Sequence, residues 1–216
     1  MKCVVTAGPT FENLDQARRL TNFSTGRLGT ELANFLTARG HDVTLLLGEQ
    51  STHCGERTAS SIVRFTTTAD FSAKLQAVAK QNSDAIFHAA AVSDFMFGKV
   101  WSRSANGELN EITSGKFSTR SGTLLAELVP TPKVIGSLRA WFPSARIVGW
   151  KYEVDGDRAG VLKAAKDQIR ASRTDACVAN GPAYGKNFGL LTADGKLENL
   201  LGSEELFSAL ESLIHS

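Results

Sequence analysis

Short apolar segments alternate with amphipathic segments along almost the whole chain. The apolar segments have the length of strands buried in a sheet, and the amphipathic segments have the spacing of crossover helices. Strands are predicted at residues 2–7, 42–47, 62–66, 84–90, 146–150 and 175–179. Because strands and helices alternate, the pattern predicts an α/β fold with a Rossmann-like, doubly wound and mostly parallel sheet.

Capping residues, glycines and prolines mark where the helices begin and end. Leucine and phenylalanine share one face from Gly26 to Arg39, and Gly40 follows, so a helix is predicted there. Further helices are predicted after Asp70 as an N-cap, from Pro132 to Trp141, from Asp157 to Ser172, and from Ser203 onward. The Asp194-Gly195 pair between two apolar runs predicts a C-terminal hairpin.

The segment from 93 to 122 does not fit this alternation. It is rich in serine, glycine, threonine and asparagine, and it shows no clear period. It begins just beyond the carboxyl end of a predicted strand, where open α/β sheets bind their ligands. We therefore expect a single domain over residues 1–216 with a flexible flap at about 94–122, although an inert insertion fits the same composition.

Composition and charge disfavour several classes of protein. Of 216 residues 42% are hydrophobic, and 24 basic against 22 acidic side chains leave a net charge of +2. We therefore expect no nucleic-acid partner and no membrane partner. Three cysteines without a CxxC pair predict a protein of the reducing cytoplasm. His88 lies inside an apolar run and is interpreted as a hydrogen-bonded core residue, and no metal ligand is assigned.

Glycine and hydroxyl residues cluster around the first predicted strand and helix. Gly8 and Thr10 follow the strand, and Ser24, Thr25 and Gly26 precede the helix. Backbone N–H groups at a helix start, together with the helix dipole, form a site for phosphate. The G-x-G-x-x-G fingerprint and a Walker A loop are both missing, so these residues fit tight turns and close helix packing as well as a nucleotide site.

Further candidates lie beyond the fourth predicted strand. A run of three alanines ends at Ala91 and precedes Asp94, which could bind a ribose hydroxyl, a base or a metal ion, or cap a turn. Lys116 in the flap could close over phosphate, or could be a solvated surface cation. Lys166 and Arg170 are spaced i to i+4 on a predicted helix, so their side chains point the same way.

Six short motifs follow one another in a fixed order. They are 4–10 (VVTAGPT) followed by Asp15, 22–29 (NFSTGRLG), 89–95 (AAAVSDF), 129–132 (VPTP), 148–153 (VGWKYE) and 175–180 (DACVAN). In this order the motifs resemble the phosphopantothenoylcysteine synthetase family of coenzyme A biosynthesis. The resemblance implies a homodimeric Rossmann-like ligase that uses CTP or ATP with Mg²⁺. It implies that 4′-phosphopantothenate becomes an acyl-nucleotidylate, which then reacts with cysteine.

The resemblance also implies roles for individual residues. Asn22 matches the asparagine that holds the acyl-nucleotidylate, and Lys116 matches the first lysine of the flap motif, so both are expected to be catalytic. The residues expected to bind the nucleotide are Gly8, Thr10, Ser24, Thr25, Gly26, Ala91, Asp94, Lys166 and Arg170. Ser118 and Thr119 replace later lysines of the flap motif, and a non-catalytic nucleotide-binding relative is the alternative. A dinucleotide-dependent reductase is disfavoured, because the glycine fingerprint is missing.

The family often carries a flavin-binding decarboxylase ahead of this domain. Met1 stands directly before the first predicted strand, so no flavin is expected. A protein that works alone and an excised domain are both compatible with the sequence. No residue distinguishes CTP from ATP, and no periodicity locates the dimer interface.

Overall fold

The computed structural model describes residues 1–118, 120 and 122–215, and its body is an α/β domain. The strands of the body are β1 (Lys2–Ala7), β4 (Asp42–Gly48), β5 (Ser61–Phe65), β6 (Ala85–His88), β10 (Arg146–Tyr152), β11 (Ala176–Asn180), β12 (Phe188–Thr192) and β13 (Leu197–Leu200). The helices are α1 (Arg27–Ala38), α2 (Thr68–Ala79), α3 (Leu138–Trp141), α4 (Arg158–Ser172) and α5 (Ser203–Ser212), with a 3-10 turn, η2 (Val134–Ser137), before α3.

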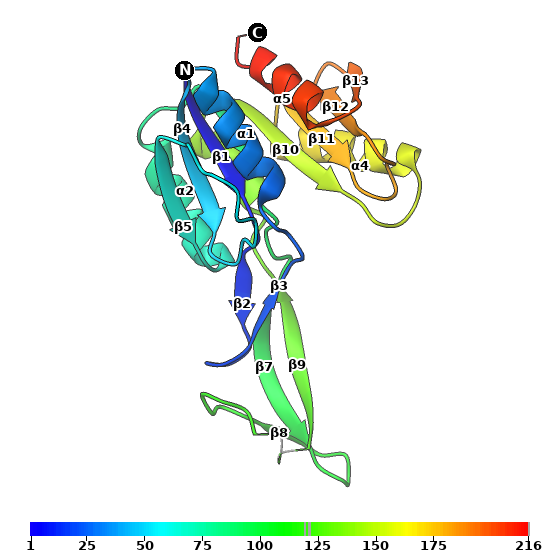
Figure 1. Ribbon diagram of the computed structural model, residues 1–216. Coiled ribbons are helices and arrows are strands. Elements are labelled where there is room, and N and C mark those ends of the chain that lie inside the picture. Colours follow the sequence, from blue (N-terminus) through cyan, green and yellow to red (C-terminus); the bar gives the residue numbers. More distant parts are fainter. Residues whose placement is uncertain (119, 121, 216) are drawn as a thin grey trace.

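These strands form one eight-stranded sheet in the order β13-β12-β11-β10-β6-β1-β4-β5 (Figure 1). The pairings from β11 to β5 are parallel, whereas β12 and β13 add an antiparallel edge. The chain first adds β4 and β5 on one side of β1 and then β6, β10 and β11 on the other side. The predicted doubly wound fold and C-terminal hairpin are therefore confirmed.

Helices cover both faces of the sheet. α1 and α5 pack on the face that carries Val5 and Leu45, whereas α2, α3 and α4 pack on the face that carries Val4 and Leu46. Successive residues of one strand are therefore buried in the two cores on opposite faces of the sheet, which explains why the strands are continuous apolar runs in the sequence. No helix in the described part of the chain combines the length and apolar character needed to cross a membrane.

The predicted helix starts agree with the structure at α4 and differ at α2. Asp157 caps α4, because its carboxylate accepts the Gly160 N–H at 2.8 Å. At α2 the prediction of Asp70 as the cap is wrong, since the hydroxyl of Thr67 accepts the Asp70 N–H at 3.2 Å. Both residue types cap helices well, so spacing alone did not separate them. The helix predicted from Pro132 begins at Val134 instead, and η2 and α3 together form it as far as Trp141.

A long antiparallel arm leaves the body where the sequence predicted an irregular flap (Figure 1). It consists of β7 (Phe95–Arg103), β8 (Leu109–Glu111) and β9 (Thr123–Pro130), in the order β8-β7-β9. Both faces of β7 and β9 are largely exposed, so their residues do not alternate strictly between apolar and polar. The expected flap at about 94–122 thus contains two strands, β7 and β8, that the sequence did not predict.

A small hairpin beside the arm was also missed. It pairs β2 (Phe11–Asn13) with β3 (Arg19–Thr21), and β2 contacts β7. Strands of three residues are too short to show a period. The hairpin connects the end of β1 to Asn22, so it determines where this candidate site residue lies.

Buried hydroxyl groups fix the base of the arm to the body. Thr10 Oγ1 accepts the Ser93 N–H at 2.8 Å, and the Thr131 hydroxyl donates to the Ser93 carbonyl. Thr131 also donates its N–H to the Asp94 carbonyl at 2.9 Å. All three hydroxyl residues are buried. Because satisfied buried polar groups hold one geometry, the arm leaves the body in a defined direction.

Candidate functional site

The two predicted glycine and alanine clusters meet at the carboxyl edge of the sheet. Gly8 follows β1 and Ala91 follows β6, and the Ala91 N–H donates to the Gly8 carbonyl at 3.0 Å. β1 and β6 flank the point where the order of strands reverses, which is where doubly wound sheets open to bind ligands. The structure thus joins segments that lie some eighty residues apart in the chain.

Gly8 and Gly26 line this edge with backbone conformations that favour glycine. Their φ angles are 80° and 77°. A Cβ would lie 1.9 Å from Ser51 Oγ at Gly8 and 2.7 Å from the same atom at Gly26. Ser51 Oγ is buried and has no hydrogen-bond partner among the described residues. Sequence reasoning missed Ser51, because a serine in a polar loop carries no distinguishing pattern.

The N-terminus of α1 opens beside these glycines. The helix has no side-chain cap and no acidic residue in its first turn. Thr25 is exposed, and its hydroxyl accepts the Arg27 N–H at 3.2 Å, while Ser24 is half-buried. Gly29 permits close packing, since a Cβ there would lie 2.6 Å from Ala7 Cβ. An uncapped helix end of this kind offers backbone N–H groups and partial positive charge to an anion.

Asn22 joins the same edge from the end of β3. Its Nδ2 donates to the Ala91 carbonyl at 3.2 Å, and the neighbouring Thr21 hydroxyl donates to the Thr10 carbonyl at 2.9 Å. The Asn22 side chain is exposed. The bond to Ala91 uses one of the two amide hydrogens, so the second can be donated to a ligand. We call Gly8, Asn22, the 24–26 segment and Ala91 the cradle.

Thr10 lies behind the cradle instead of lining it. It is fully buried, and its hydroxyl already accepts the Ser93 N–H and lies 3.3 Å from Thr68 Oγ1. The sequence placed Thr10 among the nucleotide contacts because it follows Gly8 closely. Its side chain points into the body, where it orders the backbone.

Asp94 lies at the base of the arm, where it forms an ion pair with Lys133. Both side chains are mostly exposed, and the pair lies just beyond the alanine run that ends at Ala91. Lys133 was not singled out from the sequence, although it directly follows the motif 129–132. An exposed ion pair contributes little to stability, so a ligand can replace either partner at small cost.

Lys116 follows β8 in the arm and lies beside the tip of the β2–β3 hairpin, away from the cradle. Its side chain is exposed, and its neighbours Gly115 and Phe117 contact that tip. At about 3.3 Å per residue, the three residues of β3 separate the tip from Asn22 by about 10 Å. Ser118 is also exposed. Thr119 lies outside the described residues.

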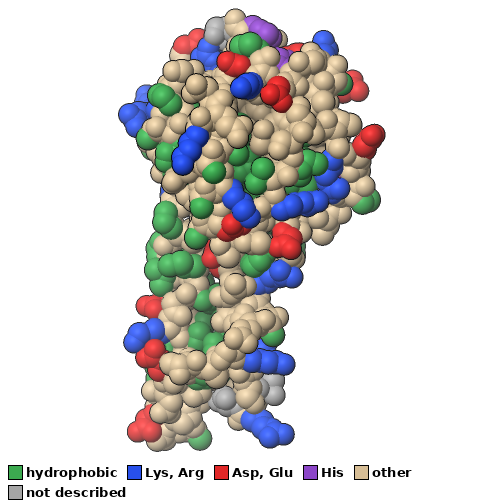
Figure 2. Space-filling model, turned by 90° about the vertical axis from the view of Figure 1, so that its left-hand side faces the viewer, with side chains coloured by type: hydrophobic (Ala, Val, Ile, Leu, Met, Phe, Trp, Pro, Cys, Tyr) green, Lys and Arg blue, Asp and Glu red, His purple; other side chains and the backbone are tan. Residues whose placement is uncertain are grey.

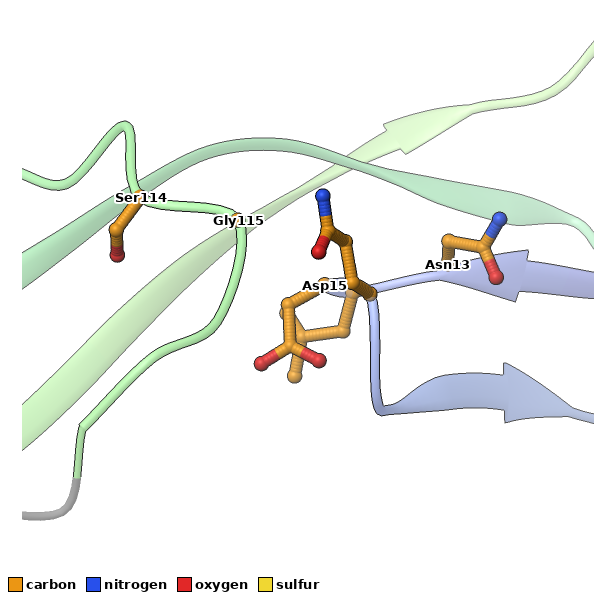
Figure 3. A pocket seen from close by; sticks show the side chains of 6 residues that line it. Asn13, Asp15, Ser114 and Gly115 are labelled. Carbon is orange, nitrogen blue, oxygen red and sulfur yellow. The ribbon is translucent and has the colours of Figure 1, made fainter.

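An open crevice of about 410 Å³ accompanies this contact (Figure 3). It is lined by residues from the hairpin tip and the arm, namely Asn13, Leu14, Asp15, Gln16, Ser114 and Gly115. The crevice therefore belongs to the junction of hairpin and arm, and the cradle lies at the opposite end of the hairpin.

Lys166 and Arg170 lie on the solvent side of α4. α4 covers the face of the sheet opposite to α1, so the structure does not bring these two side chains to the cradle. Their charges act locally on Asp167, where the hydrogen bond from Lys163 is the main cause that lowers the pKa of the carboxyl group. Spacing on a helix predicted a shared direction for the two side chains but not the face of the sheet.

His88 is buried at the end of β6, in agreement with its interpretation as a core residue. Its Nδ1 lies 2.9 Å from the Thr6 hydroxyl, and its ring stacks on Phe71 at 5.7 Å between centroids. Burial lowers the pKa of the imidazole to about 4, so the ring is neutral at physiological pH. Within the described residues, no group of three or more His, Cys, Asp or Glu side chains is placed to hold a metal ion.

Comparisons with known proteins identify a family model and relatives that this chain resembles. The family model of the DNA/pantothenate metabolism flavoprotein C-terminal domain matches residues 1–205. The chain is 32% identical over 187 residues to the coenzyme A biosynthesis bifunctional protein CoaBC of Thermococcus kodakarensis, a match that covers 83% of this chain and 41% of that protein. It is 32% identical over 155 residues to the phosphopantothenate–cysteine ligase of Mus musculus, a match that covers 68% and 46%. The chain thus spans less than half the length of these relatives.

A solved structure extends the comparison to three dimensions. The DNA/pantothenate metabolism flavoprotein from Streptococcus pneumoniae aligns with a TM-score of 0.86 at 25% identity. The alignment covers 100% of this chain and 98% of that one. Body and arm are therefore shared features.

Proposed function

The chain belongs to the family of the DNA/pantothenate metabolism flavoprotein C-terminal domain, and from this membership we propose that it is a phosphopantothenate–cysteine ligase. It would join 4′-phosphopantothenate to cysteine in coenzyme A biosynthesis, with CTP or ATP as the activating nucleotide. The observation that carries the proposal is the cradle, in which the Asn22 amide lies beside two left-handed glycines and an uncapped helix start.

The first step would activate the carboxylate of 4′-phosphopantothenate. A nucleoside triphosphate fits the cradle because the backbone around Gly8 and Gly26 can approach its phosphates closely, and the α1 terminus attracts their charge. A carboxylate oxygen then attacks the α-phosphorus, and pyrophosphate leaves. The product is an acyl-nucleotidylate that stays bound beside Asn22.

The second step would use the Asn22 amide. The amine of cysteine attacks the acyl carbon, the nucleoside monophosphate leaves, and the amine gives up a proton. Negative charge gathers on the carbonyl oxygen in the transition state, and an N–H of Asn22 Nδ2 can be donated to it. A single donor of this kind accelerates acyl transfer by about 100- to 1000-fold.

The residues present fit Mg²⁺ bound mainly by substrate. Magnesium usually takes one or two carboxylates and fills its remaining positions with phosphate oxygens and water. Asp94 is an exposed carboxylate at the edge of the cradle, and its ion pair with Lys133 is exposed enough to open. When bound, the ion would neutralise charge on the triphosphate, and Asp94 would hold it.

Other assignments extend the proposal. Lys116 would be a catalytic cation, as the resemblance implies. The nucleotide contacts implied for Lys166 and Arg170 do not extend to the cradle, because α4 covers the face of the sheet opposite to α1. Mg²⁺ would be required and no flavin would be bound, and the enzyme would work in the cytoplasm.

A homodimer is supported by exposed apolar side chains along the arm, including Met96 and Leu128 (Figure 2).

The direct assay is release of pyrophosphate from CTP or ATP in the presence of 4′-phosphopantothenate and Mg²⁺, followed by addition of cysteine. We expect turnover with at least one nucleotide. We also expect Asn22→Ala to slow the cysteine step by about 100-fold or more, because it removes the amide donor. No release with either nucleotide would contradict the proposal.

A non-catalytic nucleotide-binding relative is the second candidate. It is favoured by Ser118, which is uncharged where the resemblance predicts a lysine. Nucleotide binding by calorimetry without any turnover would support this candidate over the ligase.

A further inference from the structure

The tip of the β2–β3 hairpin forms hydrogen bonds with the residues on both sides of Lys116. The Gln16 N–H donates to the Gly115 carbonyl at 2.9 Å. On the other side, the Phe117 N–H donates to Asp15 Oδ2 at 3.2 Å. In Figure 3, Asp15 lies between the β2–β3 hairpin and the loop that contains Gly115. The backbone of Lys116 is thus held at both of its neighbours.

Asp15 is the centre of this contact. Its Oδ1 accepts the N–H groups of Ala17 and Arg18, each at 2.7 Å, and these bonds form the turn of the hairpin. Its Oδ2 accepts the Phe117 N–H and a guanidinium N–H of Arg18 at 2.9 Å. Arg18 also donates to the Phe117 carbonyl at 3.2 Å. Oδ1 therefore bonds within the hairpin, whereas Oδ2 bonds both to the arm and to Arg18.

The surroundings of Asp15 favour a fixed backbone at residues 115–117 and an exposed Lys116 side chain. The Asp15 side chain is completely shielded from solvent, and Phe117 is 6% exposed. Burial opposes ionisation of Asp15, but the N–H groups of Ala17, Phe117 and Arg18 outweigh it and lower the pKa of the carboxyl group. Lys116 itself is exposed. Its backbone is held through its two neighbours, while its side chain extends into solvent.

The same hairpin is anchored to the cradle at its other end. β2 pairs with β3 in the register Asn13 with Arg19 and Phe11 with Thr21. The Thr21 hydroxyl then bonds to the body, and Asn22 follows. One short paired element therefore joins the contact at Asp15 to the amide at Asn22, and it sets the separation between them.

We propose that Asp15 is a positioning residue, which holds the segment bearing Lys116 against the hairpin that leads to Asn22. This inference rests on the proposed ligase function. A lysine on a free loop loses conformational entropy when it binds a phosphate in the transition state, and a fixed backbone reduces that loss. Asp15 acts through Lys116 and does not touch substrate.

Asp15→Asn retains the hydrogen bonds of Oδ1 and removes those of Oδ2. The asparagine keeps Oδ1 for the Ala17 and Arg18 N–H groups, so the turn of the hairpin is retained. Its Nδ2 replaces Oδ2 and faces the Phe117 N–H and the Arg18 guanidinium, so donors meet donors and the bonds to both partners are lost. Asp194→Asn is a matched control, because Asp194 accepts the Lys196 N–H in a turn of the body.

Hydrogen exchange, thermal unfolding and steady-state kinetics test the proposal. Exchange of the Phe117 amide hydrogen should be about 10-fold faster in Asp15→Asn, as expected for loss of a hydrogen bond to a charged group, and the melting temperature should fall by only a few degrees. The rate constant kcat should fall about 10-fold with little change in KM for nucleotide. Asp194→Asn should alter neither the exchange nor kcat.

A double-variant cycle identifies the partner. In a Lys116→Ala background, Asp15→Asn should cause no further loss of kcat, because the residue through which it acts is missing. An equal further loss would overturn the proposal, as would unchanged exchange at Phe117 or a kcat above that of the parent chain. If the parent chain releases no pyrophosphate, the proposed function fails, whereas the exchange measurement still decides whether Asp15 holds the segment.

Discussion

A methyl group on Gly26 would meet Ser51 Oγ at 2.7 Å and would sit on a backbone with a φ of 77°. Gly26→Ala is therefore expected to lower the free energy of unfolding by about 2–4 kcal/mol, from backbone strain and from overpacking together. It should also abolish nucleotide binding. Gly40→Ala is the matched control, because Gly40 has a φ of 83° and open space around it. Urea unfolding and calorimetry check both effects, and equal behaviour of the two variants would contradict the role of the cradle.

His88 gives the stability of the protein a defined dependence on pH. Burial lowers the pKa of its imidazole from 6.5 to about 4, so between these values the unfolded chain binds a proton that the folded protein does not. Stability should therefore fall as the pH is lowered from 6.5 toward 4, by about 3 kcal/mol from this residue.

Replacement of His88 by a residue that does not titrate checks this sign. His88→Gln should show a shallower loss of unfolding free energy over the same pH range, measured by urea unfolding. His215→Gln is the control, because His215 is exposed. A parent-like pH profile in His88→Gln would show that burial of this ring is not the cause.

At the scale of elements, the predictions were correct for helices with one buried face and for strands buried on both faces. β1 and β4 are apolar because helices cover both faces of the sheet, and α1 shows its single apolar face plainly. β7 and β9 have no fully buried face, so their pattern is weak, although their pairing is regular. Hydrogen bonding between the strands, which leaves little trace in side-chain type, stabilises the arm.

The base of the arm depends on Thr10. Thr10→Val keeps the shape of the side chain but leaves the Ser93 N–H without its acceptor, so we expect a loss of about 1–3 kcal/mol in unfolding free energy. Nucleotide affinity should be unchanged, because the hydroxyl lies behind the cradle. Thermal unfolding and calorimetry measure the two quantities. A large loss of affinity with unchanged stability would instead place Thr10 in the nucleotide site.

At the scale of the whole molecule, the arm is the proposed dimer surface. Leu128 is 50% exposed on β9. If two arms pack together, Leu128→Glu buries a charge in the interface, and it should shift the protein from dimer to monomer in sedimentation velocity. Leu201→Glu is the control, because Leu201 is 71% exposed on the body. Identical sedimentation of both variants and the parent would rule out this surface.

The candidate site was predictable in part. The cradle could be inferred because Gly8 and the 24–26 segment lie at a strand end and a helix start, positions that the pattern itself locates. The positions of Lys116 and Lys166 could not, since they depend on how the arm and α4 are placed against the body. The contact between Asp15 and Phe117 joins residues 102 positions apart, and no periodicity encodes such a pair.

Detection of the intermediate tests the central claim most directly. The protein is incubated with 4′-phosphopantothenate, Mg²⁺ and CTP or ATP without cysteine, and the quenched mixture is analysed by mass spectrometry. The proposed function predicts one equivalent of acyl-nucleotidylate per active site, which cysteine converts to the amide with release of the nucleoside monophosphate. Absence of both the intermediate and the amide with either nucleotide, while nucleotide still binds, would contradict it.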